Sequence, residues 1–191
     1  MNAVVKESAA PLKLNLCAGK SKMEGYLSVD QIAFDGLDLV ADLRQPWPWA
    51  DNSVSDIHLS HALEHFDAME RVHIFNEMYR VLINGGKCTI ITPHWASQRA
   101  YGDPTHKWPP VSEFAYYYLW REWRKVNAPH IDIEFNPQGF DCDFSWGGGY
   151  SLHADMNLWN AERQQYAQKW YKEACSDTIM TVTAQNKKSN D

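Results

Sequence analysis

The first thirty residues contain the pattern that most restricts the fold of this chain. Residues 12–16 form a short apolar run that breaks at Ala18-Gly19, and a second such run closes at Asp30. A glycine directly after a strand lets the backbone approach a ligand closely. A carboxylate that closes the next strand can accept two hydrogen bonds from a ribose diol. This arrangement is typical of open α/β sheets that bind a nucleoside at the carboxyl ends of their strands.

The following part of the chain alternates between predicted strands and a helix. Residues 67–83 carry apolar side chains at helical spacing and stop at Asn84-Gly85-Gly86, after which residues 87–92 form an apolar strand. A strand, a helix with a glycine stop and a further strand are typical of a parallel sheet. The other strands predicted in this half are residues 12–16, 25–29, 37–42 and 55–60.

The second half of the sequence is rich in aromatic residues and its pattern is less regular. We expect a loop over residues 94–110 and a helix over 111–126. Residues 131–153 contain one or two strands, interrupted by Asn136-Pro137 and by Gly147-Gly148-Gly149. The remaining expected elements are a helix over 158–175, a last strand over 178–184 and a polar tail over 186–191.

The connection between the first two strands is unusually short. Only about eight residues separate Cys17 from Tyr26, fewer than the dozen that a parallel crossover normally needs. We therefore predict a turn around residues 21–24 in place of the first helix. Since the first strand begins near residue 12, the helices that would cover a ligand from this side are also predicted to be absent.

Composition narrows the class of protein. A length of 191 residues suits a single domain, and a net charge of −6 argues against tight nonspecific binding of nucleic acid. The four cysteines are scattered without a paired motif, which favours neither a disulfide framework nor a cysteine zinc site. The N-terminus lacks the apolar core of a signal peptide and no run is long enough to span a bilayer, so we expect a cytoplasmic protein.

Three segments carry a family resemblance. LNLCAGKSKMEGYLSVD, DLVADLRQPWPWADNSVSDIHLSHALEHF and EMYRVLINGGKCTIITP resemble successive motifs of class I S-adenosylmethionine-dependent methyltransferases, in particular a small, truncated member of the methyltransferase-11-type branch. The resemblance covers residues 12–93 well and residues 94–185 weakly. It implies an α/β, Rossmann-like fold with a mostly parallel central sheet, flanking helices, an antiparallel last strand and reduced N-terminal helices.

The resemblance also implies a division of this domain. Residues 1–11 would be an N-terminal extension, 12–93 the cofactor-binding half, 94–185 the substrate-side half and 186–191 a polar tail. The implied cofactor is S-adenosylmethionine. The residues that would bind it are Asn15, Cys17, Ala18 and Gly19 at the methionine portion, Asp30 at the ribose, Asp42 and Leu43 at the adenine, and Ser60 and His61 near the sulfonium.

Several of these residues have a simpler interpretation. Gly19 could be an ordinary turn glycine, Asp30 could cap the segment that follows it, and Asp42 could pair with Arg44. The cofactor interpretation is favoured because two carboxylates each close a predicted strand downstream of a strand-to-glycine turn. Family members usually carry a glycine where this chain has Cys17.

The string from His61 to His65 also matches the H-x-x-E-H pattern of one class of zinc peptidases. Such a site would need a third ligand, for example Glu122 or Glu134. We favour the methyltransferase interpretation, which predicts no metal site. In it Leu63 and Phe66 face the core, Glu64 caps or pairs, and His65 is structural or lines the pocket.

The acceptor is expected to bind near the loop after residue 93, which lies at the ligand end of such a sheet. Candidate bases are His61, His94 and His106. Aromatic and basic residues over 116–125 are also typical of a platform for single-stranded nucleic acid, but the acidic net charge favours a small-molecule acceptor. The predicted function is methyl transfer from S-adenosylmethionine. The alternative is a non-catalytic protein of the same fold that binds the cofactor or its product and acts through a partner.

Overall fold

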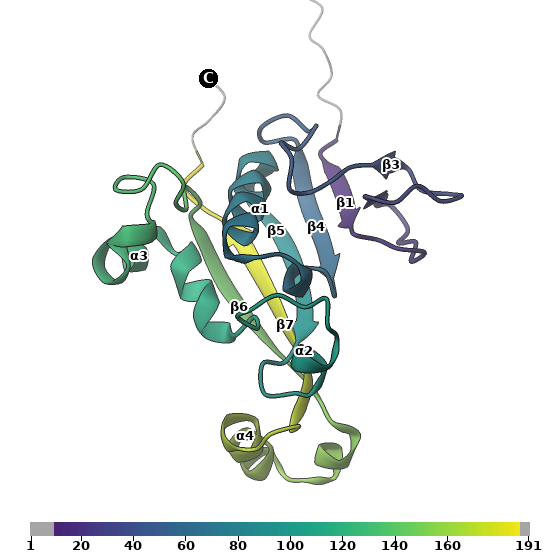
Figure 1. Cartoon of the computed structure of the whole chain (residues 1–191), viewed down its shortest axis with the longest axis vertical. Coiled ribbons are helices and arrows are strands. Elements are labelled where there is room, and N and C mark those ends of the chain that lie inside the picture. The colour runs from purple at the N-terminus through teal and green to yellow at the C-terminus, as the bar shows by residue number, and fades with distance from the viewer. Residues whose placement is uncertain (1–9, 188–191) are drawn as a thin grey trace, which may run out of the picture.

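The computed structural model describes residues 10–187, and these form a seven-stranded sheet in the order β3-β2-β1-β4-β5-β7-β6 (Figure 1). The strands from β3 to β5 are parallel, whereas β7 is antiparallel to both β5 and β6. The predicted α/β fold with an antiparallel last strand is therefore confirmed. The strands are β1 Leu12–Leu16, β2 Leu27–Asp30, β3 Leu39–Val40, β4 Val54–Ser60, β5 Leu82–Pro93, β6 Phe144–Leu152 and β7 Cys175–Ala184.

The principal helix, α1 (Ala68–Val81), lies between β4 and β5. It begins at Asp67, whose carboxylate accepts hydrogen bonds from the backbone N–H groups of Met69 and Glu70, while the Glu70 side chain accepts from the Asp67 N–H. This reciprocal capping fixes the start of the helix. One side of α1 then packs on the sheet and contributes Val72, Ile74, Phe75, Met78 and Val81 to the core.

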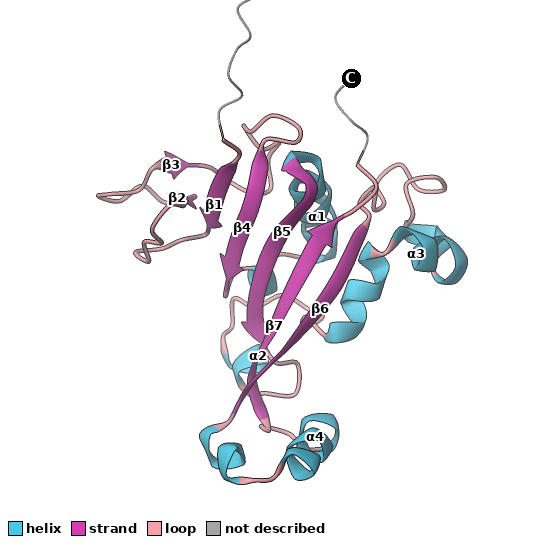
Figure 2. Ribbon diagram, turned by 180° about the vertical axis from the view of Figure 1, so that it is seen from behind, coloured by secondary structure: helices cyan, strands magenta, loops and turns pink. Residues whose placement is uncertain are grey.

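The two faces of the sheet differ. Figure 1 shows α1 in front of the sheet, while Figure 2, from behind, shows no described helix lying across β1, β4 and β5. In β4, Ile57 and Leu59 are buried, whereas Asp56 and His58, the residues on either side of Ile57, are only half-buried. Parallel sheets are normally covered on both faces and have continuous apolar strands, so this alternation is typical of a sheet with one covered face.

This open face agrees with the predicted loss of N-terminal helices. The described chain contains no helix between β1 and β2, where turns occupy residues 19–20 and 24–25. It also passes from β2 to β3 and from β3 to β4 without one. Because these connections contain no helix, none of them covers the second face of the sheet at β1 to β3.

The second half departs from several sequence predictions. The helix predicted over 111–126 is a 3₁₀ segment, Glu113–Leu119, followed by α3 (Arg121–Asn127), because the backbone is extended at Trp120. The helix predicted over 158–175 is only α4 (Ala161–Trp170), whose start is capped by Asn160, and β7 already begins at Cys175. Residues 131–153 hold the single long strand β6.

The remaining elements are short. The expected loop over 94–110 contains the one-turn helix α2 (Arg99–Gly102), and further 3₁₀ turns are Leu63–His65, Pro129–Ile131 and Ala154–Leu158. The strand predicted over 37–42 is reduced to β3. Residues 1–9 of the predicted extension and 188–191 of the predicted tail lie outside the described residues. Among residues 10–187, no helix is long and apolar enough to cross a membrane.

Candidate functional site

A cavity of about 150 Å³ lies at the carboxyl ends of β1 to β4. Because these strands are parallel, the residues that follow them meet at one edge of the sheet. The cavity brings together five of the nine residues predicted to bind the cofactor, and Asn15, Ala18, Gly19 and Ser60 do not line it. Its lining residues are Cys17, Asp30, Gln31, Ala41, Asp42, Leu43, His61, Ala62, His65 and Phe66.

The cavity is small for a whole ligand, since pockets for drug-sized molecules occupy about 300–1,000 Å³. A ligand larger than this volume would have to extend beyond the cavity onto the surface. A larger hollow of about 640 Å³ lies beside Asp51 and Arg80, at the amino end of β4. Ligands of open α/β sheets bind at the opposite, carboxyl edge, so the smaller cavity is the better candidate.

Asp30 ties the turn after β1 to the end of β2. Its Oδ2 accepts a hydrogen bond from the Gly19 N–H at 3.0 Å, and its Oδ1 accepts from the Ile32 N–H at 3.1 Å. The second contact is the local cap that the simpler interpretation expects. The first contact places the carboxylate next to the glycine turn, as the cofactor interpretation requires. Both interpretations therefore describe contacts of the same side chain.

The turn after β1 has a left-handed backbone at two positions. Cys17 has φ of 51° and Gly19 has φ of 50°. A Cβ on Gly19 would meet no atom within 4 Å, so the backbone conformation and not lack of space favours glycine there. Asn15 is buried and donates from Nδ2 to the Ser21 carbonyl at 2.8 Å, which holds the turn from within.

Cys17 lines the cavity, and it is the residue at which this chain departs from the methyltransferase pattern. Burial, and next the neighbouring Asp30 carboxylate, raise the pKa of the Cys17 thiol to about 12. The thiol is therefore protonated at neutral pH and unreactive as a nucleophile. It acts as a small apolar side chain. It fills part of the cavity that a glycine at this position would leave empty.

Asp42 and Leu43 form the far side of the cavity. Asp42 makes the pair with Arg44 that the simpler interpretation predicts, with Nε to Oδ1 and Nη2 to Oδ2 both at 2.9 Å. These hydrogen bonds lower the pKa of the Asp42 carboxyl. Oδ1 also accepts from the Arg44 N–H at 3.0 Å, whereas Oδ2 keeps a further lone pair that can accept from a ligand. Leu43 is buried, and its carbonyl accepts from Trp47 Nε1 at 3.1 Å.

His61 follows β4 and also has a left-handed backbone, with φ of 50°. Its Nδ1 lies 3.5 Å from Glu64 Oε1 and its Nε2 lies 3.8 Å from Asp177 Oδ1. The hydrogen bond that His61 donates to Glu64 raises the pKa of His61 against the opposing effect of burial. Asp177 in turn pairs with Arg99 Nη1 at 3.0 Å. No local sequence pattern indicated Asp177, because its position depends on the antiparallel pairing of Pro93 with Asp177.

His61 and His65, the two histidines of the zinc-peptidase pattern, do not lie on one helix. His61 precedes the 3₁₀ turn Leu63–His65, so it does not share a helix face with His65. Glu134 pairs instead with Lys125 at 2.6 Å. Leu63 is buried in the core and Phe66 packs against it, as the methyltransferase interpretation predicts.

The three candidate bases do not converge on one point. Only His61 lines the cavity with Asp30. His94 is buried and lines a separate hollow of about 380 Å³, where its Nε2 lies 3.4 Å from Glu113 Oε1 and its ring contacts Tyr150. His106 packs against His65, with the ring centroids 4.7 Å apart.

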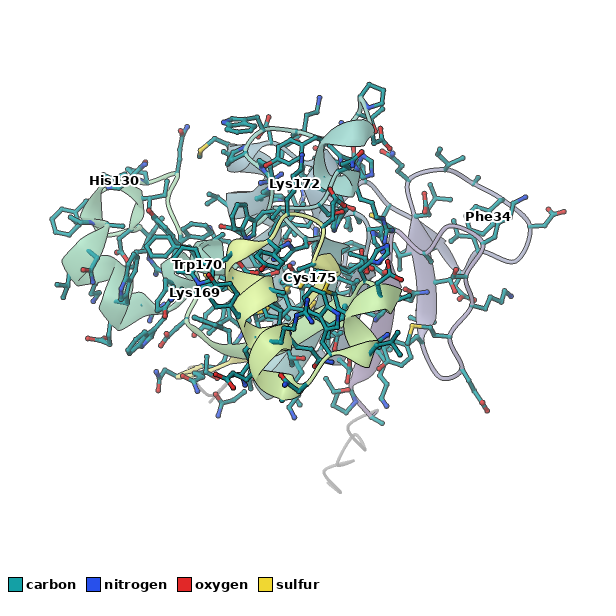
Figure 3. The ribbon with its side chains drawn as sticks, turned by 90° about the horizontal axis from the view of Figure 1, so that it is seen from below. Phe34, His130, Lys169, Trp170, Lys172 and Cys175 are labelled. Atoms are coloured by element: carbon teal, nitrogen blue, oxygen red, sulfur yellow. The ribbon has the colours of Figure 1, made fainter. Side chains whose placement is uncertain are left out.

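The view onto the carboxyl end of the sheet shows how these parts are separated (Figure 3). Lys169 and Trp170 on α4 lie over the middle of this end, whereas the loop containing Phe34 projects at one side. The hollow beside His94 is lined by Lys169 of α4, and the cavity beside Asp30 lies on the side of β1 to β4. The end of the β6–β7 pair and α4 therefore lie next to the His94 hollow and not next to the cavity beside Asp30.

Comparison with known proteins supports this reading of the fold and of the N-terminal half. A family model described as a methyltransferase domain matches residues 15–90. A search of curated protein sequences found no match. The matched segment contains the turn after β1, both carboxylates and His61.

Solved structures share the fold at low sequence identity. An S-adenosylmethionine-dependent methyltransferase from Archaeoglobus fulgidus matches with a TM-score of 0.59 and 14% identity, over 92% of this chain and 87% of that one. A 1,6-didemethyltoxoflavin N1-methyltransferase from Burkholderia thailandensis matches at 0.53 and 10%, over 92% and 72%. A putative methyltransferase from Haloferax volcanii, solved with its Trm112 activator, matches at 0.52 and 14%, over 97% and 86%.

Residues 15–90 therefore match a methyltransferase domain, and the sheet order with the antiparallel β7 is a fold shared with a solved S-adenosylmethionine-dependent methyltransferase. The resemblance predicted from the sequence is confirmed for this segment and for the fold.

Proposed function

We propose that the cavity between Asp30 and His61 binds S-adenosylmethionine and that the protein transfers the methyl group to a small-molecule acceptor. The observation that carries this proposal is the joining of Gly19, Asp30 and Asp42 around one edge of a parallel sheet. Two carboxylates at the ends of neighbouring strands suit a ligand with a diol and an amino group.

The residues around this cavity offer the polar groups that such a cofactor needs. Asp30 already holds the turn after β1, and its remaining lone pairs would accept from the ribose hydroxyl groups. Asp42 would accept from the adenine amino group, with Leu43 against the ring. The left-handed turn at Gly19 and the neighbouring Ala18 would contact the methionine portion.

The bound cofactor supplies an electrophilic methyl group, so the protein needs chiefly to orient the acceptor. His61 is placed to assist because it lines the cavity and is held by Glu64 and Asp177. Its raised pKa makes it a stronger proton acceptor than an ordinary imidazole. His94 would serve an acceptor only if that molecule reached the second hollow.

A small molecule is favoured over nucleic acid because the chain carries a net charge of −6. The Burkholderia structure was solved with 1,6-didemethyltoxoflavin and S-adenosylhomocysteine bound. Incubation with methyl-labelled S-adenosylmethionine and separated fractions of a cell extract tests this choice. We expect label in the small-molecule fraction, whereas label confined to RNA or DNA would contradict it.

A non-catalytic role through a partner is the second candidate. The uncovered sheet face and Cys17 favour it, and the Haloferax methyltransferase was solved with an activator. Calorimetric titration with S-adenosylmethionine and S-adenosylhomocysteine separates the possibilities. Binding followed by label transfer supports the enzyme, binding without transfer to any fraction supports the second role, and no binding of either compound contradicts both.

A further inference from the structure

The 3₁₀ turn after β4 lies against the loop that follows α2. The Lys107 N–H donates to the Glu64 carbonyl at 2.8 Å and holds the two segments together. As a result Glu64, His65 and His106 each offer one ligand atom, and these atoms all lie within 4.8 Å of one another. No other group of this kind occurs among the described residues. The cluster joins positions about forty residues apart in the sequence, so the fold and not the chain order creates it.

Both imidazole rings are held in the same tautomer. His106 Nδ1 lies 3.2 Å from the Ala100 carbonyl, which can only accept, so Nδ1 carries the proton. Thr105 donates its hydroxyl proton to Asp103 at 2.7 Å, so its oxygen accepts from His65 Nδ1 at 3.0 Å. Each ring therefore keeps an unprotonated Nε2. Metal-binding histidines are oriented by such contacts, in which the second ring nitrogen donates to a carbonyl or to a chain leading to a carboxylate.

Glu64 supplies the negative charge of the cluster. Its side chain is only 6% exposed, and Oε1 faces His61. Among the described residues, Oε2 has no hydrogen-bond partner and is fully buried. A buried carboxylate oxygen without a partner is costly unless a cation or donor satisfies it.

We propose that Glu64, His65 and His106 bind a divalent transition-metal ion of the Zn²⁺ type. Two imidazoles and one carboxylate suit such an ion better than Mg²⁺, which prefers oxygen ligands. Ligand atoms at about 2.0–2.1 Å from a tetrahedral ion lie about 3.3 Å apart, so binding requires these atoms to approach one another by up to about 1.5 Å. Three protein ligands leave at least one position of the ion open.

The position of the ion relative to the first cavity gives it a role, which rests on the proposed function. His65 lines both the metal cluster and the cavity with Asp30. An acceptor hydroxyl or amine could therefore occupy the open position and face the methyl donor. The ion would lower the pKa of that group, as it does for bound water. This assigns the acceptor to molecules with an oxygen or nitrogen that can ligate a metal.

Titration of chelator-treated protein with Zn²⁺, and with Co²⁺ followed by its visible absorption, tests the site. We expect one ion per chain, and at least tenfold weaker binding in His106→Ala and in His65→Ala. His153→Ala is the matched control, since His153 is an exposed histidine that pairs with Asp155 outside the cluster. The affinity of the His153→Ala variant for the ion should equal that of the wild-type protein.

Thr105→Val provides a second variant that keeps all three ligands but removes the partner of His65 Nδ1. Loss of such an outer contact typically weakens metal binding by about 10–100-fold. Unchanged Zn²⁺ affinity in the His106 and His65 variants, or equal loss in His153→Ala, would overturn the proposal. S-adenosylhomocysteine binding measured on the same metal-free samples reports separately on the proposed function.

Discussion

Replacement of Cys17 by glycine tests how this chain departs from the methyltransferase pattern that it resembles. Cys17 holds a left-handed backbone with φ of 51° and packs its side chain against the core. Relief of the left-handed conformation should stabilise the protein by about 1–2 kcal/mol. The greater freedom of glycine in the unfolded chain costs about 0.5–1 kcal/mol. Lost burial of the thiol costs about 1 kcal/mol more.

These terms nearly cancel, so Cys17→Gly should change the free energy of unfolding by less than about 1 kcal/mol and Tm by less than about 4 °C. Affinity for S-adenosylhomocysteine should rise, because the backbone of the turn can then contact the ligand. One additional hydrogen bond of about 1 kcal/mol corresponds to a roughly fivefold lower Kd.

Cys17→Ala is the matched control, since alanine keeps the Cβ and the backbone strain but removes the sulfur. It should be less stable than Cys17→Gly and bind S-adenosylhomocysteine with nearly the wild-type Kd. Thermal unfolding and calorimetry measure the two quantities. If Cys17→Gly binds no tighter than Cys17→Ala, the turn after β1 does not approach the cofactor and the reasoning fails.

Three further predictions concern stability. Arg124→Ala should lower the free energy of unfolding by about 3–5 kcal/mol in a denaturant titration, because it leaves Asp132 buried without its partner at 2.7 Å; a loss below 1 kcal/mol would be inconsistent with this. Gly148→Ala should also destabilise, since its Cβ would lie 2.2 Å from a backbone carbonyl of β7, and an unchanged Tm would argue against the β6–β7 pairing. His61 has a raised pKa, so its stabilising contribution is present below about pH 6.5 and lost as the pH rises through that pKa. His61→Asn, which tolerates the left-handed backbone, should therefore cost more stability at pH 6 than at pH 8.5, by less than about 1 kcal/mol because the side chain is 39% exposed.

The sequence predicted the elements whose causes are local. A short run bounded by turn residues located β4, and apolar residues at helical spacing over 67–83 located α1. The short span between Cys17 and Tyr26 correctly indicated a missing helix. Each of these features depends on neighbours within a few residues.

The second half was harder because its elements depend on distant partners. Arg124 is fully buried and donates to the Cys142 and Tyr118 carbonyls as well as to Asp132. In a surface helix an arginine is expected on the exposed face, so the sequence did not indicate that Arg124 would be buried. The helical spacing over 111–126 therefore predicted one continuous helix. The early start of β7 at Cys175 likewise depends on pairing with Leu152.

The candidate site divides in the same way. Asp30, Asp42 and His61 were predicted together because residues after parallel strands always meet at one edge. The separation of His94 from His61 depends on the path of residues 94–110 and on the long β6–β7 pair, which no local pattern specifies. The cluster of Glu64, His65 and His106 was missed for the same reason.

The most direct test of the cofactor site is calorimetric titration of S-adenosylhomocysteine into wild-type protein, Asp30→Ala and Asp35→Ala. Asp35 is an exposed carboxylate in the same loop and controls for the change in charge. Removal of charge-assisted hydrogen bonds worth about 1.5–3 kcal/mol predicts at least tenfold weaker binding in Asp30→Ala. We expect wild-type affinity in Asp35→Ala. Equal affinity in all three proteins, or no binding by the wild type, would contradict the proposed site.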